Sequence, residues 1–83
     1  MAYKIIFKSS VERDLKKIDK SQLNKIFEKI ETELAENADQ FPALTGKLAG
    51  LRKYRIGDYR VIYTIMDDSV LILRIAHRKE AYR

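Results

Sequence analysis

The chain has 83 residues, one histidine and no cysteine, and 46% of its residues are hydrophobic. This composition predicts a single globular domain over residues 1–83 and excludes a disulfide framework, a thiolate metal site and a disordered chain. We expect no metal and no cofactor, and with no apolar run near the ~18 residues of a membrane span we expect a cytoplasmic protein without a membrane partner.

The positive charge is concentrated in the second half of the chain. The net charge is +5; residues 1–45 carry eight basic and eight acidic side chains, whereas residues 46–83 carry nine basic and four acidic ones. This asymmetry indicates an anionic partner for the second half, and charge that serves only solubility is the alternative.

The chain begins with a predicted strand and a short helix. Residues 2–8 alternate apolar and polar side chains, which predicts a strand. Ser9 and Glu12 match a capping box, the signature of a helix start. The apolar stripe of the helix that follows is formed by Val11, Leu15 and Ile18.

A second helix is expected over about residues 22–37, with Ser21 as its N-cap. The short turn between the two helices predicts an antiparallel hairpin, and its charged outer faces are interpreted as solvated surface. The apolar face of the second helix is formed by Leu23, Ile26, Phe27, Ile30 and Leu34.

The rest of the chain predicts a connector over residues 37–50 and strands at 51–56, 59–66 and 70–77. The order β-α-α-β-β-β predicts an α+β fold. In this fold the helical hairpin packs on one face of a small, mainly antiparallel four-stranded sheet and leaves the other face free for function. The core is expected to include Tyr54, Tyr59 and Tyr63.

A two-residue turn at Gly57-Asp58, of the type II′ kind, fixes the pairing of the first hairpin. It places Arg55 directly opposite Arg60 on the same sheet face. Like charges so close repel each other unless an anion lies between them, and guanidinium groups match phosphate oxygens in bidentate geometry. The pair therefore favours a phosphate site over the alternative of two solvated arginines.

The sequence allows two pairings of the last strand. A two-residue turn at Asp67-Asp68 puts His77 on the face of Arg60, whereas a three-residue turn puts Arg74 and Arg78 there. Either pairing brings basic groups beside Arg60. Histidine is the side chain most suited to proton transfer at physiological pH, so His77 is a candidate catalytic group, with a packing role as the alternative.

Two segments resemble those of a known family. Residues 51–63, LRKYRIGDYRVIY, resemble the hairpin signature of RelE/ParE-superfamily toxins, and residues 77–83, HRKEAYR, resemble their C-terminal His-Arg…Tyr motif. The predicted order of elements matches as well, so the likeness covers nearly the whole chain and predicts a RelE-like fold.

The resemblance implies the toxin of a type II toxin–antitoxin pair. Its RelE branch is a ribosome-dependent endoribonuclease that cuts mRNA in the ribosomal A site. There the 2′-hydroxyl attacks the adjacent phosphate, without a metal, and leaves a 2′,3′-cyclic phosphate. The expected partners are mRNA, the ribosomal A site and an acidic antitoxin protein that covers the basic face.

By position, the resemblance makes Arg60 a phosphate stabiliser and Arg78 a phosphate ligand or general acid. Arg55 matches the first of two strand lysines, and Gly57 stands where RelE has the second, a proposed general base. Arginine is a poor base, so His77 is the candidate for that role. The expected catalytic residues are Arg55, Arg60, His77 and Arg78.

Further basic and aromatic residues are expected to bind RNA. The terminal tyrosine of the family stacks on a messenger base, and Tyr82 matches it. The expected RNA-binding residues are Lys47, Arg52, Lys53, Tyr82 and Arg83. Two alternatives remain: a ParE-type toxin that inhibits DNA gyrase, and a non-catalytic RNA-binding module with the same basic face.

Overall fold

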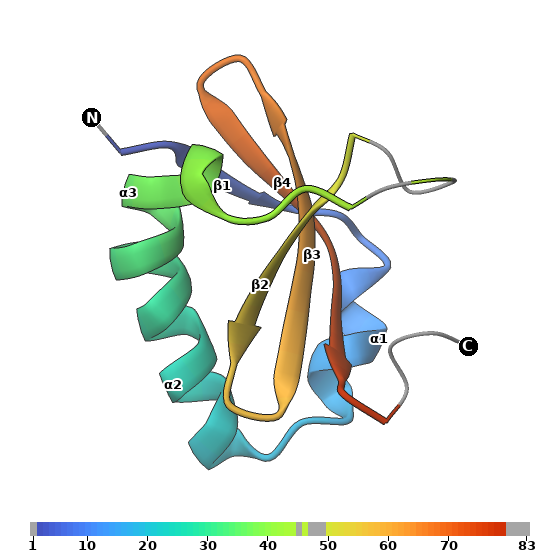
Figure 1. The fold of residues 1–83 in the computed structure, drawn as a ribbon. Helices are drawn as coiled ribbons and strands as arrows, with labels where there is room; N and C mark the ends of the chain where they lie inside the picture. Colours follow the sequence, from blue (N-terminus) through green and yellow to red (C-terminus); the bar gives the residue numbers. More distant parts are fainter. Residues whose placement is uncertain (1, 45, 47–49, 80–83) are drawn as a thin grey trace.

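The computed structural model describes residues 2–44, 46 and 50–79, and it confirms the predicted order of strands and helices (Figure 1). No helix in this part of the chain is long and apolar enough to cross a membrane. The elements are β1 (Lys4–Phe7), α1 (Val11–Lys16), α2 (Lys20–Lys29), a π-helical segment (Ile30–Leu34), α3 (Ala35–Asn37), a 3-10 turn (Ala38–Gln40), β2 (Arg52–Ile56), β3 (Tyr59–Met66) and β4 (Ser69–His77).

The four strands form one mixed sheet in the order β1-β4-β3-β2. β1 is parallel to β4, and the other two pairs are antiparallel, so the sheet is mainly antiparallel as predicted. β1 is only four residues long, so its pairing with β4 ends at Phe7 and Ile72. Within the part of the chain that the structure describes, the second half of β4 therefore has no strand on that side.

The hydrophobic core lies between one face of the sheet and the helices. The helical segment from Lys20 to Asn37 consists of α2, the π-helical segment and α3 without a break. In Figure 1 it runs along the left side of the sheet, and α1 lies at the right. Tyr54 and Tyr63 are buried and Tyr59 packs against the core, as predicted. Fully buried aliphatic side chains from both layers include Val11, Ile26, Ile30, Leu34, Val61, Val70, Ile72 and Ile75.

Both predicted helix caps were wrong. At the start of α1 the N-cap is Ser10, and no side chain caps it; the free amides bond backbone carbonyls instead, including Glu12 N to Ser9 O at 3.2 Å. Ser10 already has helical dihedral angles, so the backbone itself closes the first turn. The second helix begins at Lys20 after Asp19, before the predicted cap at Ser21.

The connector covers the outer edge of β2. Ala43 forms a bridge with Arg52, and the carbonyl of Pro42 accepts the amide of Lys53 at 3.1 Å. Edge strands left open invite pairing with other chains, and this segment occupies part of that edge. The face of the sheet opposite the helices, which we call the open face, is the one that carries Arg55 and Arg60.

Candidate functional site

The β2–β3 hairpin has the pairing that its turn predicted. Gly57 has a φ of +57°, and it is the position of a type II′ turn that needs a left-handed backbone. Arg55 pairs directly with Arg60. Arg55 is exposed and Arg60 is half-buried. Lys53, two residues before Arg55 on the same strand, lies on the same face, and its RNA-binding role stays a prediction.

The turn between β3 and β4 has two residues, because Met66 pairs with Ser69. The pairing changes further along the strand. Tyr63 pairs with Ile72, but Ile62 pairs with Arg74, so Leu73 is an extra residue and forms a β-bulge. The bulge shifts every later residue of β4 by one position.

The shift decides which side chains join the arginine pair. Ala76, not Ile75, pairs with Arg60, so Arg55, Arg60 and Ala76 form one row across the open face. The alternation puts Arg74 on this face and directs Arg78, just past the strand, to the same side. The turn therefore has two residues, as in the first alternative. Because of the bulge, however, Arg74 and Arg78 lie on the face of Arg60, as the three-residue turn predicted.

Arg78 is held beside the β2–β3 turn, two residues beyond Ala76 along the chain. Its amide donates to the carbonyl of Asp58 at 2.7 Å, and its Nε lies 3.8 Å from Oδ1 of Asp58. Both side chains are more than half exposed, so this ion pair is weak and the guanidinium remains accessible to an anion. The sequence pattern predicted Asp58 only as a turn residue.

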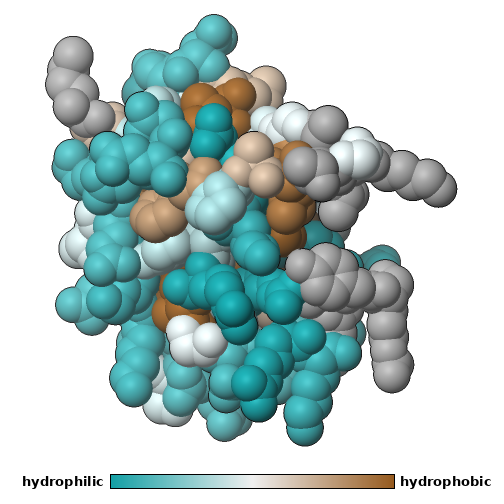
Figure 2. Space-filling model, viewed as in Figure 1, coloured by the Kyte–Doolittle hydropathy of each residue, from teal (hydrophilic) through white to brown (hydrophobic). Residues whose placement is uncertain are grey.

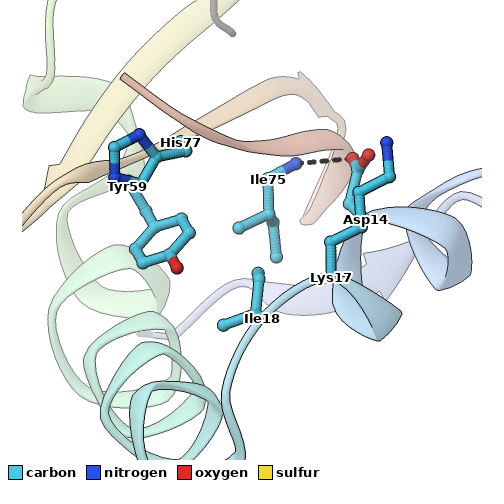
Figure 3. Close-up of a pocket in the computed structure, with 6 residues that line it drawn as sticks. All are labelled: Asp14, Lys17, Ile18, Tyr59, Ile75 and His77. Atoms are coloured by element: carbon cyan, nitrogen blue, oxygen red, sulfur yellow. Dashed lines mark hydrogen bonds between the residues drawn. The ribbon is translucent and has the colours of Figure 1, made fainter. Parts of the chain in front are cut away.

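His77 lies on the opposite face, so of the two alternatives left open by the sequence, the one that put His77 beside Arg60 is wrong. It pairs with Tyr59, and the two rings meet edge to face with centroids 5.4 Å apart. Figure 3 shows both side chains at a cavity of about 230 Å³ that Asp14 and Lys17 also line. The β-bulge is the physical reason, because it turns odd-numbered residues of late β4 toward the helices.

Arg52 is also turned away from the open face. Its Nη1 donates to the carbonyl oxygens of Phe41 at 2.7 Å and Asp39 at 3.2 Å, so its guanidinium fastens the connector to β2. Its expected RNA-binding role stays a prediction, and the structure places its guanidinium apart from the Arg55–Arg60 pair. Three other expected RNA-binding residues lie outside the described residues: Lys47, Tyr82 and Arg83.

Asp14 is a buried charged residue that was not among the expected site residues. Its side chain lies on the apolar face of α1, and Oδ2 accepts the amide of Ile75 at 2.9 Å and Nε of Arg74 at 3.3 Å. The spacing gave a signal, because Asp14 stands three residues after Val11 and four before Ile18. A carboxylate inside an apolar stripe needs partners, and these lie in β4.

Two tyrosines tie the sheet to the helical layer. The hydroxyl of Tyr54 donates to Oε2 of Glu33, and that of Tyr63 donates to the carbonyl of Ala38 at 2.6 Å. Burial, and then the hydrogen bond to Glu33, raise the pKa of Tyr54 well above its ordinary value, and burial raises the pKa of Tyr63 to about 12. The hydrogen bond from Tyr54 lowers the pKa of Glu33. These contacts fix β2 and β3 from behind the open face.

The hairpin end of the molecule is strongly polar. Figure 2 shows hydrophilic residues over much of the lower half of the view, where the β2–β3 turn and the end of β4 lie. Several guanidinium groups on one face stabilise a phosphate whose negative charge is growing, without gaining or losing protons themselves. Within residues 2–44, 46 and 50–79, no group of three or more histidine or acidic side chains is placed to hold a metal ion.

Comparison with known proteins gives consistent matches over the whole chain. Residues 5–82 match the family described as the ParE toxin of the type II toxin–antitoxin system parDE. Toxin RelG of Mycobacterium tuberculosis is 34% identical over 90 aligned residues, which cover all of this chain and 99% of that protein.

Solved structures agree with the sequence matches. The toxin–antitoxin complex RelBE2 of M. tuberculosis contains a chain with 31% identity and a TM-score of 0.89, covering 96% of this chain and 95% of that one. A mutant of E. coli toxin RelE in the free state matches with a TM-score of 0.77 over 99% of this chain and 88% of that one. Its 19% identity bears on the fold alone, and the fold is the one described above.

Proposed function

The chain belongs to the RelE/ParE superfamily of type II toxin–antitoxin toxins, and we propose that it is a ribosome-dependent endoribonuclease that cleaves mRNA. The observation that carries the proposal is the gathering of Arg55, Arg60 and Arg78 on one face at the hairpin end of the sheet. Such a cluster suits the phosphate of a nucleic acid.

In the proposed reaction the 2′-oxygen of one nucleotide attacks the adjacent phosphorus. A base removes the 2′-proton, the new O–P bond closes a cyclic phosphate, and the bond to the 5′-oxygen breaks as that oxygen gains a proton. Arg55 and Arg60 hold the phosphate oxygens as their charge grows. Arg78, whose side chain is 57% exposed and only weakly paired with Asp58, is the proposed donor of the proton to the leaving oxygen. Tyr82 remains the proposed stacking partner of a messenger base.

The proposed partner that inhibits the toxin is an acidic antitoxin protein. The proposed location of the toxin is the cytoplasm, where ribosomes translate mRNA. The far end of the open face supports this: Ile6 and Met66 are 48% and 55% exposed, and with Leu71 they line a shallow groove. A segment with apolar side chains for this groove and acidic ones for Arg55 and Arg60 would cover the face and exclude RNA.

A second candidate is inhibition of DNA gyrase, and the match to the family described as ParE toxin favours it. A gyrase inhibitor binds protein and needs no phosphate site. That function therefore does not explain why Arg55 of β2 lies opposite Arg60 of β3. A supercoiling assay with purified gyrase separates the two functions.

The test of the nuclease is to map mRNA 3′ ends on translating ribosomes with and without the protein. We expect new cyclic-phosphate ends with the wild type and none with Arg60→Ala or Arg78→Ala. Arg13→Ala, which removes an exposed arginine on α1, is the matched control and keeps full activity. Undiminished cleavage by both site variants, with folding verified by circular dichroism, would refute the proposal. If the wild-type protein binds RNA but produces no new 3′ ends, it is a non-catalytic RNA-binding module.

A further inference from the structure

The faces of β4 depend on the single bulge at Leu73. Without it, the ladder that pairs Tyr63 with Ile72 would continue by pairing Arg60 with Ile75 instead of Ala76. A shift of one residue exchanges the two faces of a strand. Ile75 and His77 would then face outward beside Arg60, and Arg74 would point into the core.

Ile75 makes two contacts that favour the shifted pairing. Its side chain is only 2% exposed, in the core. Its amide would otherwise lie on an unpaired strand edge, because β1 ends beside Ile72. Oδ2 of Asp14 accepts a hydrogen bond from that amide at 2.9 Å, which Figure 3 shows as a dashed line. The same oxygen also accepts a hydrogen bond from Nε of Arg74, the first residue after the bulge.

We infer that Asp14 is a positioning residue whose carboxylate holds β4 in the bulged pairing, so that Arg78, and not His77, lies on the face of Arg60. The carboxylate stands where the next residue of a longer β1 would offer a carbonyl. It accepts hydrogen bonds from both the amide of Ile75 and Nε of Arg74, so it favours the pairing of β4 that brings these two groups beside α1. The consequence for RNA rests on the proposed function; the consequence for strand pairing does not.

The experiment compares Asp14→Ala with Asp14→Asn, which keeps an oxygen that accepts the Ile75 amide. Cross-strand backbone NOEs in labelled protein report whether Arg60 lies beside Ala76 or Ile75. We expect the Arg60–Ala76 NOEs to disappear in Asp14→Ala and to persist in Asp14→Asn. Cleavage on ribosomes should fall by about 100-fold in the alanine variant, the scale of a catalytic group misplaced by about 1 Å, and recover in the asparagine variant.

Val11→Ala is the control for simple loss of stability. It removes fully buried side-chain atoms from the same helix without touching the carboxylate. We expect a lower melting temperature but unchanged pairing and unchanged cleavage at temperatures where the protein is folded. Equal losses of activity in Val11→Ala and Asp14→Ala, at equal folded fractions, would overturn the inference.

Deleting Leu73 in the Asp14→Ala background gives an independent test that does not depend on how stable the single variant is. The deletion removes the bulge residue, so Arg74, Ala76 and Arg78 keep their faces in an unbulged ladder. We expect the Arg60–Ala76 NOEs and cleavage to return. If Asp14→Ala protein retains the Arg60–Ala76 NOEs, the inference is wrong. If the pairing changes but cleavage stays full, the inference about strand pairing is supported, and the proposed role of Arg78 in cleavage is wrong.

Discussion

Arg55 and Arg60 lie directly opposite each other on the open face, with Ala76 on the far side of Arg60. A positive side chain facing another across a ladder is unfavourable for folding. A small alanine beside them limits crowding of the row. A phosphate bound between the two guanidinium groups would offset their mutual repulsion.

Neutralising Arg55 should separate stability from RNA binding. We expect Arg55→Gln to raise the free energy of unfolding slightly, by at most about 1 kcal/mol at low ionic strength, because it relieves a like-charge pair. RNA affinity should fall, and the slope of log affinity against log salt should decrease by about 0.7, the value for a single phosphate that the protein no longer neutralises. Chemical denaturation and fluorescence anisotropy of labelled single-stranded RNA measure the two effects.

Arg13→Gln on exposed α1 is the matched control for this pair of measurements and should alter neither RNA affinity nor its salt slope. A loss of RNA affinity in the control as large as that in Arg55→Gln would mean that net charge, not the arginine row, binds RNA.

Asp58 should weaken RNA binding through its charge. Its carboxylate lies 3.8 Å from Nε of Arg78, and both side chains are largely exposed. We expect Asp58→Asn to tighten RNA binding by up to about fivefold, since a unit charge a few Å away in water is worth about 1 kcal/mol. Stability should change little, as is usual for exposed pairs. Anisotropy titration measures the affinity; weaker binding by Asp58→Asn would show that the carboxylate holds Arg78 in place for RNA.

The Tyr54–Glu33 hydrogen bond should make stability depend on pH in the acid range. It lowers the pKa of Glu33 below its usual 4.5, so its contribution is present above that value and is lost as the pH falls through the lowered pKa. We therefore expect Glu33→Gln to be less stable than the wild type at pH 7, with the difference closing in acid. Denaturant unfolding across pH measures it.

Tyr54→Phe supplies the double-mutant control, because it removes the donor of the same hydrogen bond. In that background Glu33→Gln should have much less effect at pH 7. An undiminished effect would assign the pH dependence to the neighbouring Lys29, which also pairs with Glu33.

The turn that aligns the arginines should tolerate few side chains at Gly57. Its φ of +57° is left-handed, although a β-carbon there would meet no atom within 4 Å. We expect Gly57→Ala to destabilise the protein by about 1 kcal/mol through backbone strain alone. Gly57→Asn should cost less, because asparagine adopts this conformation more readily. Thermal unfolding tests this ranking; equal costs would place the effect in the unfolded chain.

Local sequence was enough for the parts of the fold that neighbouring residues control. The aromatic and β-branched residues of the segment 59–66 predicted β3 with its observed bounds. The two residues Gly57-Asp58 set the pairing of Arg55 with Arg60, because a tight turn leaves a hairpin one register. The apolar stripe of the second helix predicted its buried face. The caps failed because several backbone arrangements satisfy the same few amides, and a capping motif does not choose among them.

The faces of β4 depended on residues distant in the chain. The two-residue turn at Asp67-Asp68 by itself would have put His77 beside Arg60, and the bulge at Leu73 reversed this. The bulge is held by the burial of Ile75 and by its bond to Asp14, which lies 61 residues away. Sequence determined that basic groups gather at this end of the sheet; only tertiary packing decided which ones, because strand pairing responds to the whole core and not to the turn alone.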